Sequence, residues 1–391
     1  MLSSDSMKSA DRTQVLLIGM LDSIHVARWL TQFRDSSIDF FVFPSKKFRK
    51  IHPELVTLSK CNNFKIFGLP HTERISGYLD FVRFILPSKI GFKNRRQRAL
   101  SKILLSGKFD YVHALELQGA GYLVDSLDVE LLRHPSLIVT NWGSDIYFFK
   151  KFPDHERRIK SLLAKADYYS AECERDYQLA RNLNFSGADL PCIPNAGGFD
   201  LVGSSQELPL PSHRKQILIK GYGGIFGRAD LPISILELIA EEFPSYLFHF
   251  YSVTEDVQLL LNQLPDKLLS RIRITRVKQR IAHSEMLREF QKSRIYIGCS
   301  ESDGVSTSFL EALTTGTYPI QTGTSCANEW VMKGAVASII ELTESSLLSA
   351  IREALSGDSV VDDASRVNFS ISKKYLSNEV IAHSAQQFYL V

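Results

Sequence analysis

Segments with the pattern of a buried strand alternate with helical segments along the whole chain. Such alternation is typical of parallel sheets with helices on both faces, because each parallel strand pair needs a crossover connection. The strands predicted in the first half are Val15–Gly19, Asp39–Phe43, Lys65–Leu69, Tyr111–Leu115, Leu137–Asn141, Tyr168–Ala171 and Cys192–Pro194. Those predicted in the second half are Ile217–Lys220, Phe248–Val253, Ile272–Thr275, Ile295–Cys299, Tyr318–Gln321 and Ser338–Glu341.

The chain length and one irregular segment indicate two domains. At 391 residues the chain is too long for a single compact core. Residues 203–215 are rich in Ser, Pro and charge and have no periodicity, so they indicate a boundary. We therefore expect two α/β domains, at 1–202 and from 203 onward, with the carboxyl ends of both sheets turned toward a common cleft.

Composition excludes several classes of protein. The net charge of +3 is too small to argue for nucleic acid binding. The five cysteines are scattered without a CxxC pair, which supports neither a disulfide framework nor a zinc site. The N-terminus has no apolar signal core, and no apolar run approaches the roughly 20 residues that span a bilayer. We expect a cytoplasmic protein.

Residues 294–322 are the most informative segment. An apolar strand (Arg294–Cys299) leads into an acidic turn of small residues (Ser300–Ser306), a helix opening at Thr307–Leu313 and a second strand (Tyr318–Thr322). The turn lies at the carboxyl end of a strand, where open α/β sheets bind ligands. Backbone N–H groups at the helix start, with carboxylates around them, suit a ligand that carries hydroxyls and phosphates.

Two other interpretations of these acids remain open. Ser308 and Glu311 have the spacing of a helix capping box, and Asp303 can serve its own turn. Glu301 and Asp303 also form an acid-x-acid pair that could hold the Mg²⁺ of a nucleotide, although no third carboxylate stands nearby in the sequence.

A glycine-rich turn opens the second domain. A strand leads into Gly221, Gly223, Gly224 and Gly227, and a helix is predicted from about Asp230. Glycines allow a diphosphate to approach the backbone closely, and Lys220 and Arg228 add two positive charges. The same pattern also occurs in strand-to-helix turns that bind nothing.

The run SDGVSTSFLEALTTGTYPIQT resembles the donor-binding motif of the retaining nucleotide-sugar glycosyltransferases of family 4, which have the two-domain GT-B fold. This family has Glu, seven residues and a second Glu; here Asp303 and Glu311 stand at those places. The resemblance implies that Asp303 and the backbone of four residues hold the donor sugar, and that Glu311 holds the nucleotide ribose. Those four residues are Gly304, Val305, Ser306 and Thr307.

Other segments resemble this family in the same order. Asp22–Leu30, with His25, resembles the loop after the first strand, and Val139–Asp145 a strand-end turn. Many relatives have a His where this chain has Trp142, so a proton donor there would be Asp145, His113 or His25, unless none is needed. Each of His25, His113 and His283 can instead be a packing or capping residue, which is the commoner role of a lone His, and His283 is expected at the surface.

Three further stretches complete the resemblance. Ile193–Asp200 resembles the stretch that leads to the interdomain linker. Lys220 and Arg228 occupy the region where the family has an Arg and a Lys about five apart, but here the spacing is eight and the order is reversed. Within residues 203–372 we expect the donor domain, and we expect 373–391 to form a helix that packs back on the first domain.

Residues 81–108 form a basic stretch with interleaved apolar side chains and no acid. Its cations are Arg83, Lys89, Lys93, Arg95, Arg96, Arg98, Lys102 and Lys108. Such a stretch can lie on an anionic membrane surface, which would place the protein peripherally at the inner face of the cytoplasmic membrane. A solvated helix and loop is the equal alternative.

These features predict a metal-independent glycosyltransferase that moves a sugar, with retention, from a nucleotide diphosphate to a hydroxyl of a glycan or lipid-linked glycan. The resemblance points to surface polysaccharide or lipopolysaccharide biosynthesis. Lys220, Arg228 and a helix N-terminus would neutralise the leaving diphosphate. The alternatives are an epimerase or hydrolase of sugar nucleotides with the same fold, and a non-catalytic nucleotide-sugar-binding subunit.

Overall fold

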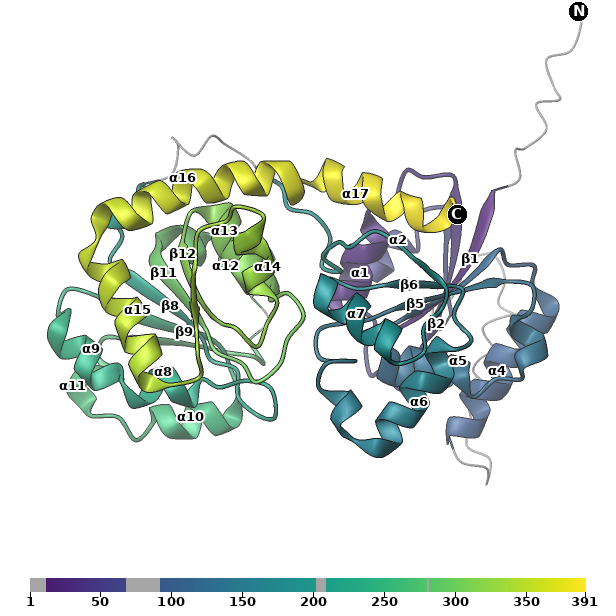
Figure 1. Cartoon of the computed structure of the whole chain (residues 1–391), viewed down its shortest axis with the longest axis horizontal. Helices are drawn as coiled ribbons and strands as arrows, with labels where there is room; N and C mark the ends of the chain where they lie inside the picture. Colours follow the sequence, from purple (N-terminus) through teal and green to yellow (C-terminus); the bar gives the residue numbers. More distant parts are fainter. Residues whose placement is uncertain (1–11, 68–91, 202–208, 280) are drawn as a thin grey trace, which may run out of the picture. The chain divides into compact units, whose positions relative to one another are not determined.

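The computed structural model describes residues 12–67, 92–201, 209–279 and 281–391. Contacts divide the chain into unit 1, Met1–Gly197 with Ala382–Val391, and unit 2, Gly198–Ile381. Each unit is built on one parallel sheet with helices on both faces (Figure 1). The predicted fold class, two Rossmann-like α/β domains, is therefore confirmed. The contacts divide the chain at Gly197 and Ile381, whereas the sequence placed the boundaries at 202 and 372.

Unit 1 has a seven-stranded sheet in the order β3-β2-β1-β4-β5-β6-β7. Its strands are β1 Thr13–Gly19, β2 Ile38–Pro44, β3 Phe64–Ile66, β4 Tyr111–Leu115, β5 Ser136–Thr140, β6 Tyr168–Ser170 and β7 Ala188–Asp189. Val15, Leu16 and Leu17 of β1 are fully buried. Successive residues of a strand point to opposite faces, so continuous burial means that helices cover both sides of this sheet.

The helices of unit 1 are α1 Ile24–Thr31, α2 Pro53–Leu58, α4 Phe92–Ser106, α5 Tyr122–Asp125, α6 Pro153–Leu163 and α7 Glu174–Asn182. A π-type turn, Leu117–Gly121, precedes α5. The Ser23 hydroxyl caps α1 by accepting a hydrogen bond from the backbone N–H of His25 at 3.2 Å. This cap fixes the start of α1 directly after the loop that follows β1.

Unit 2 has a six-stranded sheet in the order β10-β9-β8-β11-β12-β13. Its strands are β8 Gln216–Lys220, β9 Leu247–Val253, β10 Ile272–Arg276, β11 Ser293–Gly298, β12 Tyr318–Thr322 and β13 Ser338–Ile340. Its helices are α8 Asp230–Ser234, α9 Leu236–Glu242, α10 Glu255–Leu261, α11 Asp266–Leu269, α12 His283–Lys292, α13 Thr307–Thr315, α14 Ala327–Met332, α15 Glu344–Ser356 and α16 Asp358–Tyr375.

Each sheet has a point where the strand order reverses. In unit 1 it lies between β1 and β4, and in unit 2 between β8 and β11. The connections on the two sides of such a point run to opposite faces of the sheet, which leaves a crevice at the carboxyl ends of the strands. The loops after β1, β4, β8 and β11 are therefore the places where each unit by itself is best suited to hold a ligand.

Two sequence predictions about secondary structure are wrong. Residues Cys192–Pro194 are not a strand; the last strand of unit 1 is β7, Ala188–Asp189. Pro191 precedes the predicted segment and Pro194 ends it, and neither has an N–H to donate to a sheet. The single helix predicted over 373–391 is two, because α16 ends at Tyr375 and α17 (Asn378–Gln386) follows. The final residues of the chain nevertheless belong to unit 1.

Among the residues that the structure describes, no helix is both long enough and apolar enough to cross a membrane.

Candidate active site

The turn between β11 and α13 has the predicted form. Helix α13 begins at Thr307 and ends with Gly316 in the left-handed conformation (φ 70°). Its N-cap residue, Ser306, makes no side-chain cap hydrogen bond. The first backbone N–H groups of this nine-residue helix therefore receive no acceptor from a capping side chain, and the positive end of the helix dipole favours an anion there.

Asp303 lies half-buried in this turn. Its Oδ1 accepts a hydrogen bond from the backbone N–H of Gly304 at 2.9 Å, which is the local turn role that the sequence left open. Burial, and to a smaller extent the charge of Asp303, raise the pKa of the Tyr296 phenol. The tyrosine thus stays protonated beside the acid. Gly304, Val305 and Ser306 are buried and Thr307 is half-buried around this carboxylate.

Glu311 does not belong to a capping box. The N-cap of α13 is Ser306, and Ser308 is already the second residue of the helix. Ser308 and Glu311 therefore have the spacing of a capping box but not its position at the helix start. Oε1 of Glu311 lies 2.7 Å from Nε2 of His283, the first residue of α12. His283 is exposed, as predicted, but the sequence did not indicate this contact between two helices.

The glycine turn after β8 differs from the prediction. The N–H of Gly223 donates to Oγ1 of Thr254 at 3.1 Å, and that of Gly224 to Oδ2 of Asp256 at 2.9 Å. Hydrogen bonds from the Thr254 side chain and from the Gly224 N–H lower the pKa of Asp256. The amides predicted to bind a diphosphate therefore already have hydrogen-bond acceptors within the protein. These glycines can still allow a ligand to approach the backbone closely.

The two predicted cations have different surroundings. Arg228 donates from Nε and Nη2 to Asp230 and from Nη1 to Glu301 at 2.6 Å, and these bonds raise its pKa. Lys220, at the end of β8, has its Nζ 5.9 Å from the ring centre of Tyr222 and makes no ion pair within the described residues. The positive charge of Arg228 is thus balanced by the neighbouring carboxylates of Asp230 and Glu301, whereas no described carboxylate pairs with Lys220. Glu301 is paired with Arg228.

The loops after β8 and β11 are joined at the crevice. The N–H of Arg228 donates to the Cys299 carbonyl at 3.0 Å, and that of Glu301 to the Phe226 carbonyl at 2.7 Å. The predicted glycine turn and the predicted acidic turn therefore form one surface at the point where the strand order of unit 2 reverses.

In unit 1, His25 and Trp142 lie together. Their ring centres are 5.7 Å apart in an edge-to-face arrangement. Asp145 accepts hydrogen bonds through Oδ2 from the backbone N–H of Leu117 at 2.8 Å and of Trp142 at 3.0 Å. Burial and the neighbouring Glu116 raise the pKa of Asp145 well above its usual range. Asp145 thus ties the turn after β5 to the turn after β4.

His113 is not at the edge of the sheet. It is fully buried within β4, with Nδ1 2.7 Å from the Tyr389 hydroxyl and Nε2 2.6 Å from Oγ1 of Thr140. Burial lowers its pKa to about 3, so the imidazole is neutral. Of the three proposed substitutes for a proton donor at Trp142, His113 is therefore excluded by its position.

Sequence reasoning missed Glu116. It follows β4 at the point where the strand order of unit 1 reverses, and its φ of 102° is strained for a residue with a side chain. Its carboxylate accepts hydrogen bonds from the N–H of Gly119 at 2.7 Å and of Ala120 at 2.6 Å. Burial raises its pKa, against the effect of these bonds. The sequence pattern that could have indicated Glu116 is an acid shortly before the small residues Gly119, Ala120 and Gly121.

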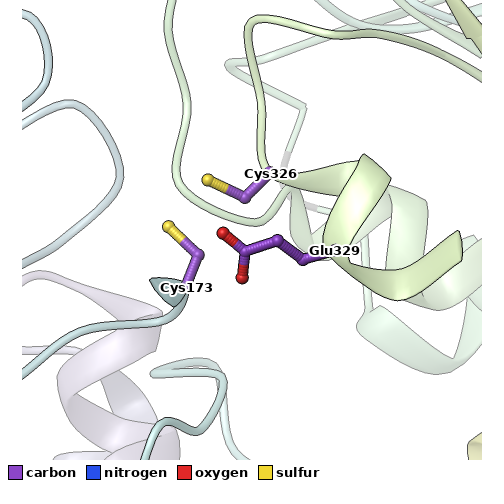
Figure 2. Close-up of side chains that lie close together, drawn as sticks. All are labelled: Cys173, Cys326 and Glu329. Carbon is purple, nitrogen blue, oxygen red and sulfur yellow. The ribbon is translucent and has the colours of Figure 1, made fainter. Parts of the chain in front are cut away.

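The described residues of either unit alone bring together no three ligand atoms of His, Cys, Asp or Glu. Cys326 is the N-cap residue of α14 and Glu329 lies in its first turn, both in unit 2 (Figure 2). Cys173 is the residue before α7 in unit 1. Structural zinc sites take four protein ligands and catalytic ones three, so the two ligands of α14 do not make a metal centre.

Comparisons with known proteins agree with this geometry. Residues 14–172 match the model of a family described as glycosyl transferase 4-like. No curated protein matches the sequence. Sucrose-phosphate synthase from Thermosynechococcus elongatus is similar in structure, with a TM-score of 0.68 and 13% identity, over 97% of this chain and 98% of that chain.

Two further solved structures give the same result. HepE from Anabaena, in complex with UDP and glucose, has a TM-score of 0.67 at 11% identity over 96% of this chain and 99% of that chain. A glycosyltransferase from Rickettsia africae has a TM-score of 0.65 at 13% identity, over 97% of this chain and 98% of that chain. Identities this low show the fold, which is that of the GT-B glycosyltransferases, and the match over residues 14–172 shows that unit 1 is similar to the glycosyl transferase 4-like family.

Proposed function

We propose that the protein transfers a sugar, with retention of anomeric configuration, from a nucleotide diphosphate to a hydroxyl of a glycan or lipid-linked glycan. The supporting observation is that the turn at residues 303–306 and the helix that follows it, α13, together carry every predicted contact to the sugar and ribose. The uncapped N-terminus of α13 follows Asp303, and Glu311 lies one turn further along. The HepE structures hold UDP or UDP-glucose, which supports a nucleotide-sugar donor for a chain of this fold.

The leaving diphosphate would be neutralised chiefly by Lys220 and by the N-terminus of α13, because the charge of Arg228 is already balanced by Asp230 and Glu301. Two of the five N–H groups of Arg228 remain for a phosphate oxygen. We propose that no metal ion takes part. The acceptor hydroxyl would attack the face from which the diphosphate leaves, with a phosphate oxygen taking the proton.

We propose that unit 1 supplies the acceptor contacts. His25, Trp142 and Asp145 lie along the carboxyl edge of its sheet, where a hydroxyl-bearing ligand would meet an imidazole, an indole and a half-buried acid. Of the three, His25 carries the imidazole, the side chain that most often serves as a general acid or base. Asp145 would act through Trp142, by holding its backbone in place.

We further propose a role in surface polysaccharide synthesis, at the inner face of an anionic membrane. Within the basic stretch 81–108, residues 81–91 lie outside the described residues. On α4, Arg98 and Lys102 are exposed, whereas Arg95 is buried and Arg96 donates to the Ser45 carbonyl. Among the described residues of this stretch, fewer cations face solvent than the sequence implied.

Isosteric substitution of the two acids tests the proposed transfer. Asp303→Asn should lower transfer about a hundredfold or more, as for the loss of a group that binds the transition state. Glu311→Gln should mainly raise the donor KM, about tenfold or more, because it weakens a charged hydrogen bond to ribose. Glu241→Gln, on the exposed face of α9, is the matched control and should leave both constants unchanged.

The same assay separates the alternative functions. Release of free sugar or a changed sugar nucleotide in the absence of acceptor would indicate a hydrolase or epimerase. Nucleotide-sugar binding with no turnover on any acceptor would indicate a binding subunit. Full transfer by both acid variants would contradict the proposed site.

A further inference from the structure

The contact between His283 and Glu311 joins helices α12 and α13, across 28 positions of the sequence. Glu311 is 7% exposed, and a carboxylate so deeply buried is costly without a hydrogen-bond donor. Among the described residues, His283 is the only side chain that bonds it, through Oε1 at 2.7 Å. A carboxylate can only accept, so Nε2 of His283 carries the proton.

We propose that His283 is a positioning residue for the donor nucleotide: it holds Oε1 of Glu311, so that Oε2 is presented to the hydroxyls of the ribose. This inference rests on the proposed function. Oε2 is bonded by no described residue, and the exposed side of the pair is the His283 ring, 39% of whose side chain is accessible. A bound ribose would therefore meet a carboxylate whose orientation is already fixed, which reduces the entropy lost on binding.

The alternative is that the pair only tethers α12 to α13. A tether would contribute to stability equally with and without nucleotide, and its loss would not distinguish ligands with and without ribose hydroxyls. A positioning residue predicts the opposite: its loss should weaken only those ligands whose hydroxyls use Glu311. The two roles therefore differ in whether the loss of His283 changes the preference for nucleotides that carry ribose hydroxyls.

The test measures binding by the full-length protein. UDP, GDP and ADP are titrated singly into the wild type by calorimetry, and the tightest is compared with its 2′,3′-dideoxy counterpart. The same pair is then titrated into His283→Ala, His283→Gln and Ser284→Ala. The glutamine carries an N–H at a similar reach, and Ser284 is the exposed neighbour on the same helix turn, which makes it the control.

We expect His283→Ala to weaken the ribonucleotide about tenfold, as for the loss of one hydrogen bond to a charged group, and to leave the dideoxynucleotide unchanged. His283→Gln should restore most of the difference, and Ser284→Ala should match the wild type. In a Glu311→Ala background, His283→Ala should have no further effect, because it acts through Glu311.

Two results would overturn the inference. If His283→Ala lowers the melting temperature but leaves the ratio of the two affinities at the wild-type value, the pair is a tether. If it weakens both nucleotides equally, His283 does not act on the ribose. Failure of the wild type to bind any of the three nucleotides would instead contradict the proposed function itself.

Discussion

Nδ1 of His113 lies 2.7 Å from the hydroxyl of Tyr389, although the two residues are 276 positions apart in the chain. The contact continues through Nε2 of His113 to Thr140, and from Thr140 to Ser170, so one chain of hydrogen bonds crosses β4, β5 and β6. The Trp29 indole N–H also donates to Tyr389. The last residues of the protein are thereby part of the core of unit 1.

Deleting residues 387–391 should destabilise unit 1. The deletion removes Phe388 and Tyr389, which are 0% and 2% exposed, and a large buried aromatic contributes roughly 3–5 kcal/mol each. Denaturant unfolding should show a loss of at least about 3 kcal/mol. Leu390→Ala, at a residue that is 67% exposed, is the control and should change stability by less than about 0.5 kcal/mol. Unchanged stability of the deletion variant would contradict this packing.

Stability should fall with acidification through His113. Burial lowers its pKa from 6.5 to about 3, so below pH 6.5 the unfolded state binds a proton that the folded state does not. The stabilisation is full above pH 6.5 and is lost as the pH falls toward 3, with a limiting slope of about 1.4 kcal/mol per pH unit. His249 in unit 2, with a pKa lowered to about 4, acts in the same direction.

Replacing His113 isolates its contribution to the pH dependence of stability. Between pH 6.5 and 4, the free energy of unfolding of His113→Gln should fall less steeply with decreasing pH than that of the wild type. The two slopes should differ by up to about 1.4 kcal/mol per pH unit, the value for one proton. Unfolding by denaturant at a series of pH values measures the difference. Parallel curves for the two proteins would rule out the neutral, buried imidazole.

Lys220 should matter more to diphosphate binding than Arg228. Arg228 is bonded to Asp230 and Glu301, so Arg228→Met removes a charge that is already compensated. Lys220→Met removes a cation without an ion pair in the described residues, and a lost charged hydrogen bond costs about 1.5–3 kcal/mol. Calorimetry with UDP, GDP or ADP should show a loss of about tenfold or more for Lys220→Met and a smaller one for Arg228→Met. The reverse order would contradict the predicted roles.

Two glycines of the turn after β8 should respond differently to alanine. A Cβ at Gly227 would lie 1.9 Å from the Tyr222 carbonyl oxygen, so Gly227→Ala must displace the backbone. Gly224 has a φ of +72° with nothing within 4 Å of its Cβ position, so Gly224→Ala costs only about 1 kcal/mol of backbone strain. Thermal unfolding should show a clearly larger loss for Gly227→Ala. Equal losses would mean that the turn adapts freely.

Local patterns in the sequence were enough to predict the parallel α/β architecture and the arrangement of residues 294–322. The alternation of buried strands with helices is a local pattern, and the strand, acidic turn and helix around Asp303 were predicted from neighbouring residues alone. Asp303 and Glu311 also stand out in the sequence, since short-range spacing is all that is required to place one in the turn before α13 and the other on the helix itself. The same holds for Lys220 at the end of a strand.

Which backbone amides and charged side chains of the site are already hydrogen-bonded could be learned only from the packing of distant segments. The amides of Gly223 and Gly224 are used by Thr254 and Asp256, and Arg228 by Glu301, across separations that no local pattern encodes. His283 reaches Glu311 because α12 and α13 pack side by side, and His113 meets Tyr389 because the C-terminal residues fold into unit 1. Periodicity specifies which face of an element is buried, whereas the partner across that face depends on the packing of the whole fold.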